Sequence, residues 1–209
     1  MRRRRYAGSA AVVWTSGGIG YLILEAIAAA AFRPHYSYTH NLISDLGRSG
    51  SALARLMNTA FCLQGILFLA GAILVVRAFE ILRAGLFLSL AAENAVGNIL
   101  IAVFHSGPAA QADGTAWVHG TGALLAIVGG NAAILAGSYS IPDVSWPRWY
   151  RRVSAGLAAL GLLSFTIFAI ESKIAAIGIV PPATWERCSV YSIIAWQTVT
   201  AILCYTRSR

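Results

Sequence analysis

The chain has 209 residues, of which 57% are hydrophobic and only 11% are charged, and its formal net charge is +8. This composition excludes an ordinary soluble domain, because one soluble core cannot bury so large a share of apolar residues. The sequence therefore predicts an all-α integral membrane protein, with a single transmembrane domain over residues 1–209 and no room for a second domain.

Six apolar stretches follow one another along the chain, each near the roughly 20 residues that a helix needs to cross a bilayer. They cover residues 9–32, 55–76, 84–104, 117–136, 153–170 and 188–205. The links between them are short and carry proline, glycine or arginine, which favours antiparallel neighbours. We therefore expect a bundle of six transmembrane helices.

The positive charge lies almost wholly between these apolar stretches. In a six-span chain, the side that holds both termini carries more arginine and lysine than the other side, so both termini are expected in the cytoplasm. This places the protein in the inner (plasma) membrane of the cell as a multi-pass protein. The basic residues are expected to meet headgroups of the lipid bilayer, and nucleic-acid binding is not needed to explain them.

Glu25 lies inside the first apolar stretch, and the outer loop that follows it, residues 33–56, holds the densest group of polar side chains. Its candidate ligand contacts are His35, Tyr36, His40, Asn41, Ser44, Asp45, Gly47 and Arg48. Ser44 or Asp45 can also cap a short turn that ends at Gly47, which explains the Ser-Asp-Leu-Gly string without a ligand.

The third apolar stretch contains an unusual group of polar residues, Glu93, Asn94, Asn98 and His105. The spacing puts the two asparagines and His105 on one stripe of a helix, with Glu93 beside it. Glu93 would lie roughly 18 Å from His105 along the axis, near the middle of a ~30 Å hydrocarbon core. A carboxyl group at that depth must pair, line a wet cavity or be protonated, so we expect an interior polar pocket.

Polar residues in the other apolar stretches are candidate walls of this pocket, namely Glu25, Gln64, Asn131 and Gln197. Two interpretations stay open: a hydrogen-bonded clamp between helices, or a site for a ligand, a proton or a reaction that opens outward. In an enzyme, Glu93 or Glu25 would serve as general acid, and Asp45 or His119 as base. The sequence has no nucleophile motif, nucleotide-binding loop or haem-attachment site, so no cofactor is predicted.

All four histidines are expected on the outer side, together with Asp113, Lys173, Glu186 and Arg187. They lack the HxxxH and HExxH spacings that bring two imidazoles to one metal ion. We therefore predict no metal site and assign the histidines to hydrogen bonding at the interface.

Residues 41–47 (Asn-Leu-Ile-Ser-Asp-Leu-Gly), followed by Met57-Asn58, resemble the motif of the domain of unknown function 998, a family of prokaryotic membrane proteins with six helices. The resemblance extends to His119 and to Trp185-Glu186-Arg187. Where the family has Phe-Pro after the third helix, this chain has Phe104-His105. The resemblance implies the six-helix layout, and it does not supply a reaction.

These features favour a bundle that binds an amphipathic or isoprenoid-type lipid in an outward-opening pocket. Arg48 and Arg187 would pair with an anionic head group, while glycine-lined helices accommodate the tail. One alternative is a small proton-coupled transporter, in which Glu93 is the coupling group. Another is a structural or accessory subunit that binds a second copy of itself or another membrane protein through its glycine faces and polar clamps.

Overall fold

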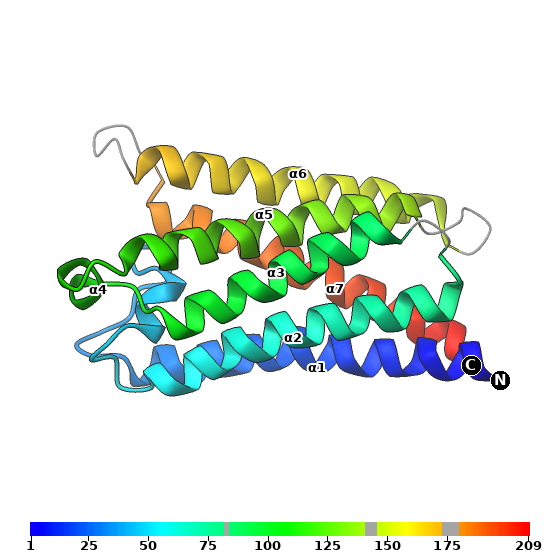
Figure 1. Ribbon diagram of the computed structural model, residues 1–209, viewed down its shortest axis with the longest axis horizontal. Helices are drawn as coiled ribbons and strands as arrows, with labels where there is room; N and C mark the ends of the chain where they lie inside the picture. Colours follow the sequence, from blue (N-terminus) through cyan, green and yellow to red (C-terminus); the bar gives the residue numbers. More distant parts are fainter. Residues whose placement is uncertain (82–83, 141–145, 173–179) are drawn as a thin grey trace.

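The computed structural model describes residues 1–81, 84–140, 146–172 and 180–209 (Figure 1). Six long helices span Arg2–Ala31 (α1), Ala54–Phe79 (α2), Gly85–Val103 (α3), Ala116–Ser140 (α5), Arg148–Glu171 (α6) and Pro182–Ser208 (α7). A 3₁₀ helix, η1 (Ile43–Gly47), follows α1, and a short helix, α4 (Pro108–Ala112), follows α3. All six long helices are long and apolar enough to cross a membrane, which confirms the predicted helical membrane bundle.

Each predicted stretch corresponds to one long helix, but most helices extend beyond the apolar residues. α1 begins at Arg2, and α7 begins at Pro182 instead of near residue 188. An apolar stretch measures only the part that lies in hydrocarbon, whereas the backbone hydrogen bonds continue through polar residues, and proline is accepted in the first turn of a helix. Parts of three predicted links, residues 82–83, 141–145 and 173–179, lie outside the described residues, and the last of these includes Lys173.

The long helices form a closed ring in the order α1, α2, α3, α5, α6 and α7, because each packs against the next and α7 returns to α1. α5 also contacts α7 across the ring. Figure 1 shows both chain termini at one end of the bundle, and α4 with the link between α1 and α2 at the other. The end that carries η1 and α4 is termed the loop end.

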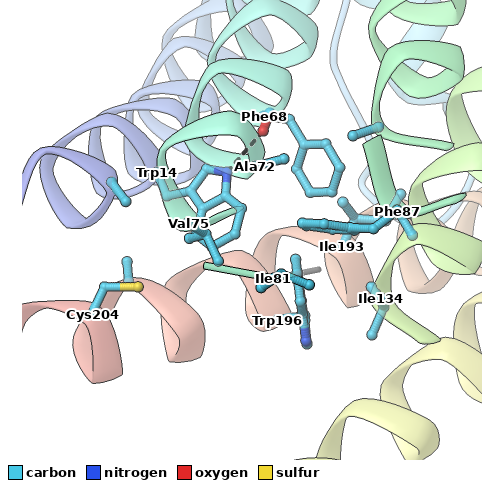
Figure 2. Close-up of a cluster of buried hydrophobic side chains, with 14 of the residues drawn as sticks. Trp14, Phe68, Ala72, Val75, Ile81, Phe87, Ile134, Ile193, Trp196 and Cys204 are labelled. Carbon is cyan, nitrogen blue, oxygen red and sulfur yellow. Dashed lines mark hydrogen bonds between the residues drawn. The ribbon is translucent and has the colours of Figure 1, made fainter. Parts of the chain in front are cut away.

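A cluster of buried aromatic side chains fills the bundle on the side toward the termini (Figure 2). The ring centroid of Trp14 lies 5.4 Å from that of Trp196 and 6.2 Å from that of Phe68. The indole N–H of Trp14 donates to the backbone oxygen of Phe68 at 3.0 Å, so the large ring leaves no unpaired donor. A Cβ atom at Gly71 would overlap the Trp14 indole, so α2 needs glycine there. The helices are therefore fixed to one another by a packed core in the half of the bundle nearer the termini.

Glycines allow α3 and α5 to approach closely. A Cβ atom at Gly97 of α3 would meet backbone atoms of Ala126 and Gly122 on α5. Small residues of this kind let membrane helices pack where apolar side chains gain nothing from leaving lipid. The contact fixes the register of the two helices that carry Asn94 and His119.

Candidate functional site

The link between α1 and α2 folds over the loop end and is held in shape by its own polar side chains. Oδ2 of Asp45 accepts a hydrogen bond from the backbone N–H of Leu42 at 3.0 Å. The hydroxyl of Tyr36 donates to the backbone oxygen of Leu42 at 3.0 Å. These bonds fix η1, which is the short turn that the sequence predicts to end at Gly47.

Two neighbouring helices fasten η1 at its two ends. Oε2 of Glu186 on α7 accepts a hydrogen bond from the backbone N–H of Ile43 at 2.6 Å. Nδ2 of Asn58 on α2 donates to the backbone oxygen of Gly47 at 3.0 Å. A Cβ atom at Gly47 would overlap Oδ1 of Asn58, so this approach requires glycine. The three segments that carry the family resemblance, residues 41–47, 57–58 and 185–187, thus meet at one place.

Arg187 connects α7 to the link, the segment between α1 and α2. Its Nη1 donates to the backbone oxygen of Asn41 at 2.8 Å, and its Nη2 donates to the hydroxyl of Tyr36. The guanidinium carbon also lies 5.4 Å from the ring centroid of Tyr36 and 5.1 Å from that of Tyr38. Burial raises the pKa of the Tyr36 phenol, although the Arg187 charge opposes the shift. The phenol therefore stays neutral and keeps the proton that it donates to the link.

Glu25 of α1 lies beside Arg187 in the interior. The hydroxyl of Tyr191 donates to both carboxylate oxygens of Glu25, at 2.9 and 3.0 Å, and Nε of Arg187 lies 3.8 Å from Oε1. Glu25 is only 1% exposed and Arg187 is 7% exposed, so two opposite charges share a buried position. We term Glu25, Tyr36, Glu186, Arg187 and Tyr191 the clamp.

A pocket lies beneath η1, between α1, α2, α3, α5 and α7, and about 560 Å³ of space free of atoms lies in and in front of it, space open to solvent included. Apolar side chains make most of its wall, including Phe61, Ile101 and Ile194. Its wall residues with polar side-chain groups are Tyr21, Ser44, Gln64, Asn94, Asn98, His119 and Glu186. We term this space the central pocket. It brings together residues from five separate helices that the sequence could only list one by one.

Backbone carbonyls fix the direction of the two asparagine side chains in this wall. Nδ2 of Asn94 donates to the backbone oxygen of Ala126 at 2.5 Å. Nδ2 of Asn98 donates to the backbone oxygen of Asn94 at 2.9 Å. Because a carbonyl oxygen only accepts hydrogen bonds, the NH₂ end of each amide must face it, and each Oδ1 is turned away from that carbonyl.

The same reasoning determines the orientation of the Gln64 amide and the tautomer of His119. Nε2 of Gln197 donates to the backbone oxygen of Trp14 at 2.8 Å, so its Oε1 faces Gln64 and accepts from Nε2 of Gln64 at 2.7 Å. Nδ1 of His119 lies 2.7 Å from the backbone oxygen of Phe104 and must carry a proton. The neutral imidazole therefore has an acceptor at Nε2.

The other residues of the predicted stripe on α3 lie elsewhere. Glu93 is half-buried, its Cβ next to Gly129 of α5, and it does not line the central pocket. Glu93 precedes Asn94 by one residue, which is about 100° around the helix, and the pocket faces the asparagine side. His105 lies in a separate depression with Asp113. Among the described residues, no group of three or more His, Cys, Asp or Glu side chains is placed to hold a metal ion.

Two further candidates from the link also lie outside the pocket wall. His40 is exposed, and its Nδ1 lies 3.1 Å from the hydroxyl of Ser37. Arg48 lies 3.7 Å from Asp45, and its guanidinium carbon is 5.4 Å from the ring centroid of Phe32. Both residues therefore interact within the link itself.

The sequence analysis listed Tyr36 among the candidate contacts of the outer loop, but it did not single out Tyr191 of α7. Tyr191 follows Arg187 by four residues, so both side chains lie on the same face of α7. That spacing was a usable signal. The pairing of Tyr36 with Arg187 was not predicted, because this contact joins residues far apart in the chain.

Six membrane-spanning helices closed in a ring, with a buried polar clamp at one end, define a polytopic helical membrane protein. The model of a family described as protein of unknown function (DUF998) matches residues 4–203. The chain belongs to this family, as the motif at residues 41–47 indicated. No curated protein and no solved structure matches the chain.

Proposed function

We propose that the protein binds an amphipathic lipid or isoprenoid-type ligand in the central pocket. The observation that carries this proposal is the pocket wall itself, which is mostly apolar and has a few polar groups that converge from different helices. Such a wall suits a ligand with a hydrocarbon part and a small polar end. Glycines on α3 and α5 keep the helix backbones close, so the pocket has a rigid frame.

The proposed setting is the inner (plasma) membrane, with both termini in the cytoplasm and the loop end facing outward. Arg2, Arg3, Arg4 and Arg5 lie at the end opposite η1, which supports this orientation by the positive-inside rule. The ligand would then enter from the outer side. The clamp would hold the link in place over the pocket.

The geometry favours binding over catalysis or transport. Of the four residues considered as acids or bases, His119 lines the central pocket. Glu25 is engaged by Tyr191 and Arg187. Asp45 holds η1, and Glu93, which would couple protons in a transporter, lies to the side of the pocket. Three of the four groups thus have structural contacts in place of access to a ligand.

The proposal can be tested by filling the pocket. Ala123 lines it, and Ala123→Leu would place a larger side chain in the space of the ligand. We expect native mass spectrometry of the unmodified protein to show one retained lipid or isoprenoid species, and the variant to lose it. Ala159→Leu is the matched control, because Ala159 is exposed on α6 and outside the pocket wall.

Thermal unfolding in the same detergent would show whether both variants are folded. Absence of any retained species from the unmodified protein would overturn the proposal. Equal retention by folded Ala123→Leu would do the same.

A further inference from the structure

Two side chains of the central-pocket wall carry buried oxygens without partners. Oε1 of Gln64 and Oδ1 of Asn94 have no hydrogen-bond partner within the part of the chain that the structure describes. The two residues are only 5% and 3% exposed, and both line the pocket. A buried acceptor that is left unpaired is costly, and native proteins rarely keep one without a reason. The two oxygens therefore point to a bound group that donates hydrogen bonds.

These oxygens cannot be exchanged for donors by turning the amides over. A rotated Asn94 would place its oxygen against the backbone oxygen of Ala126, at the position where Nδ2 now donates. A rotated Gln64 would oppose Oε1 of Gln197, which is itself fixed by the Trp14 carbonyl. The surrounding backbone thus determines that both side chains present acceptors.

Two other polar groups of the wall, on His119 and Glu186, also present acceptors, whereas the hydroxyls of Tyr21 and Ser44 can both donate and accept. His119 presents Nε2 as an acceptor, because Nδ1 donates to the Phe104 carbonyl. Glu186 adds a carboxylate, one oxygen of which accepts from Ile43. Among the described residues that line the pocket there is no lysine or arginine. Acceptors and one acidic group therefore face the ligand without a cation to balance an anion.

The two arginines expected to bind an anionic head group are occupied elsewhere. Arg187 bonds to Asn41 and Tyr36 in the clamp. Arg48 lies beside Asp45 and over the ring of Phe32. A phosphate or carboxylate in the central pocket would meet the hydroxyls of Tyr21 and Ser44 but no cation, and it would lie next to the Glu186 carboxylate.

We infer that the polar end of the ligand is a hydrogen-bond donor, either an alcohol hydroxyl or a protonated amine, and that the pocket rejects phosphate and carboxylate heads. The inference rests on the proposed function and names its ligand class. The hydrocarbon part would lie against the apolar wall, and the O–H or N–H groups would reach Gln64 and Asn94.

The test is a set of four amphiphiles with the same dodecyl chain: dodecylamine, dodecanol, dodecanoate and dodecyl phosphate. Binding to the purified full-length protein in neutral non-ionic detergent is measured by the shift in unfolding temperature. Folded Ala123→Leu gives the background from the micelle. We expect the amine and the alcohol to bind at least tenfold more tightly than either anion. If the anions bind as tightly as the donors, the head-group inference is wrong and ligand binding stands. If none of the four binds above background, the proposed function fails as well.

Two variants locate the effect. Gln64→Met removes Oε1 at similar volume, and Asn94→Leu removes Oδ1, so each should weaken amine or alcohol binding about fivefold. Asn131→Leu is the matched control, because Asn131 is also buried with an unpaired Oδ1 but does not line the pocket. It should leave the order of the four amphiphiles unchanged. Unchanged binding by folded Gln64→Met and Asn94→Leu would overturn the assignment of these oxygens.

Discussion

Arg187 illustrates how a single side chain can connect three segments of a membrane protein. Its planar guanidinium donates in two directions to the link, while Nε faces Glu25 of α1. Lysine has one charged nitrogen and cannot reproduce this fork. The charge is also needed, because Glu25 is buried beside it and would otherwise be an uncompensated carboxylate.

Replacing Arg187 by methionine should lower the free energy of unfolding by about 3 kcal/mol, because Glu25 then keeps only its bonds from Tyr191. Adding Glu25→Gln should recover at least about 1 kcal/mol, since the buried charge is gone. Denaturant unfolding in detergent measures both values. Arg207→Met, at an exposed position near the end of α7, is the control and should change little. A double variant as unstable as the sum of the two single variants would contradict this account of the clamp.

For single residues, the sequence predicted which polar side chains are buried, but it did not predict which residues they contact. An ionisable residue inside an apolar stretch predicts burial, and Glu25 is buried as expected. Its partners Arg187 and Tyr191 come from α7, and no spacing within either helix reveals such a long-range pair. Glu93 also lies inside an apolar stretch, so burial was predicted for it too, but it is only half-buried at the α3–α5 contact. A difference of one position on a helix decides which side a residue faces.

Among the helices, the contact between α3 and α5 is the one that sets the shape of the central pocket. Asn94 and Asn98 come from α3, and His119 comes from α5, so their distances depend on how closely the two helices approach. Gly97 lies against backbone atoms of α5, which cannot move aside as a flexible side chain can. The closeness of the helices is therefore sensitive to a single methyl group.

Gly97→Ala should lower the free energy of unfolding by about 1–3 kcal/mol, because the added methyl group overpacks the contact. The matched control is Gly156→Ala on α6, where a Cβ atom would meet nothing within 4 Å. That change should be neutral or stabilise by up to roughly 1 kcal/mol, since alanine favours a helix. Thermal unfolding in one detergent compares the two variants. Equal stability of the two would show that α3 and α5 tolerate a wider separation.

The length and apolarity of the six stretches predicted that each forms a helix, but they did not predict the residues at which the helices begin and end. Apolar windows stop where polar residues begin, whereas α1 continues to Arg2 and α7 to Pro182. The turn at η1 was also readable, since Ser-Asp-Leu-Gly combines a capping side chain with a terminating glycine. α4 was not expected, because five residues are too few for a periodic pattern.

In the molecule as a whole, the cluster of N-terminal arginines and the clamp lie at opposite ends of the long axis. The N-terminal arginines lie at the end of the termini, and the clamp lies at the loop end (Figure 1). The sequence indicated this separation from the order of the spans. The order of helices in the ring was not available from sequence, because short links restrict each neighbour without determining how the ring closes.

The proposed orientation predicts a difference in labelling between the two ends. In a chain whose Cys62, Cys188 and Cys204 are replaced by serine, Gln111→Cys in α4 should react with a membrane-impermeant maleimide in intact cells. Arg209→Cys should react only after the cells are made permeable. Both positions are exposed, so access depends on the side of the membrane. Labelling of Arg209→Cys in intact cells, with Gln111→Cys protected, would reverse the orientation.

The pairing of Glu25 with α7 also has a consequence for biogenesis. The hydroxyl that holds this acid belongs to a residue 166 positions later in the chain. Synthesis proceeds from the N-terminus, so α1 enters the bilayer long before its counter-charge has been made. During that interval the acid must be protonated or sheltered by the insertion machinery. Insertion of α7 then both completes the bundle and neutralises the carboxylate of its first helix.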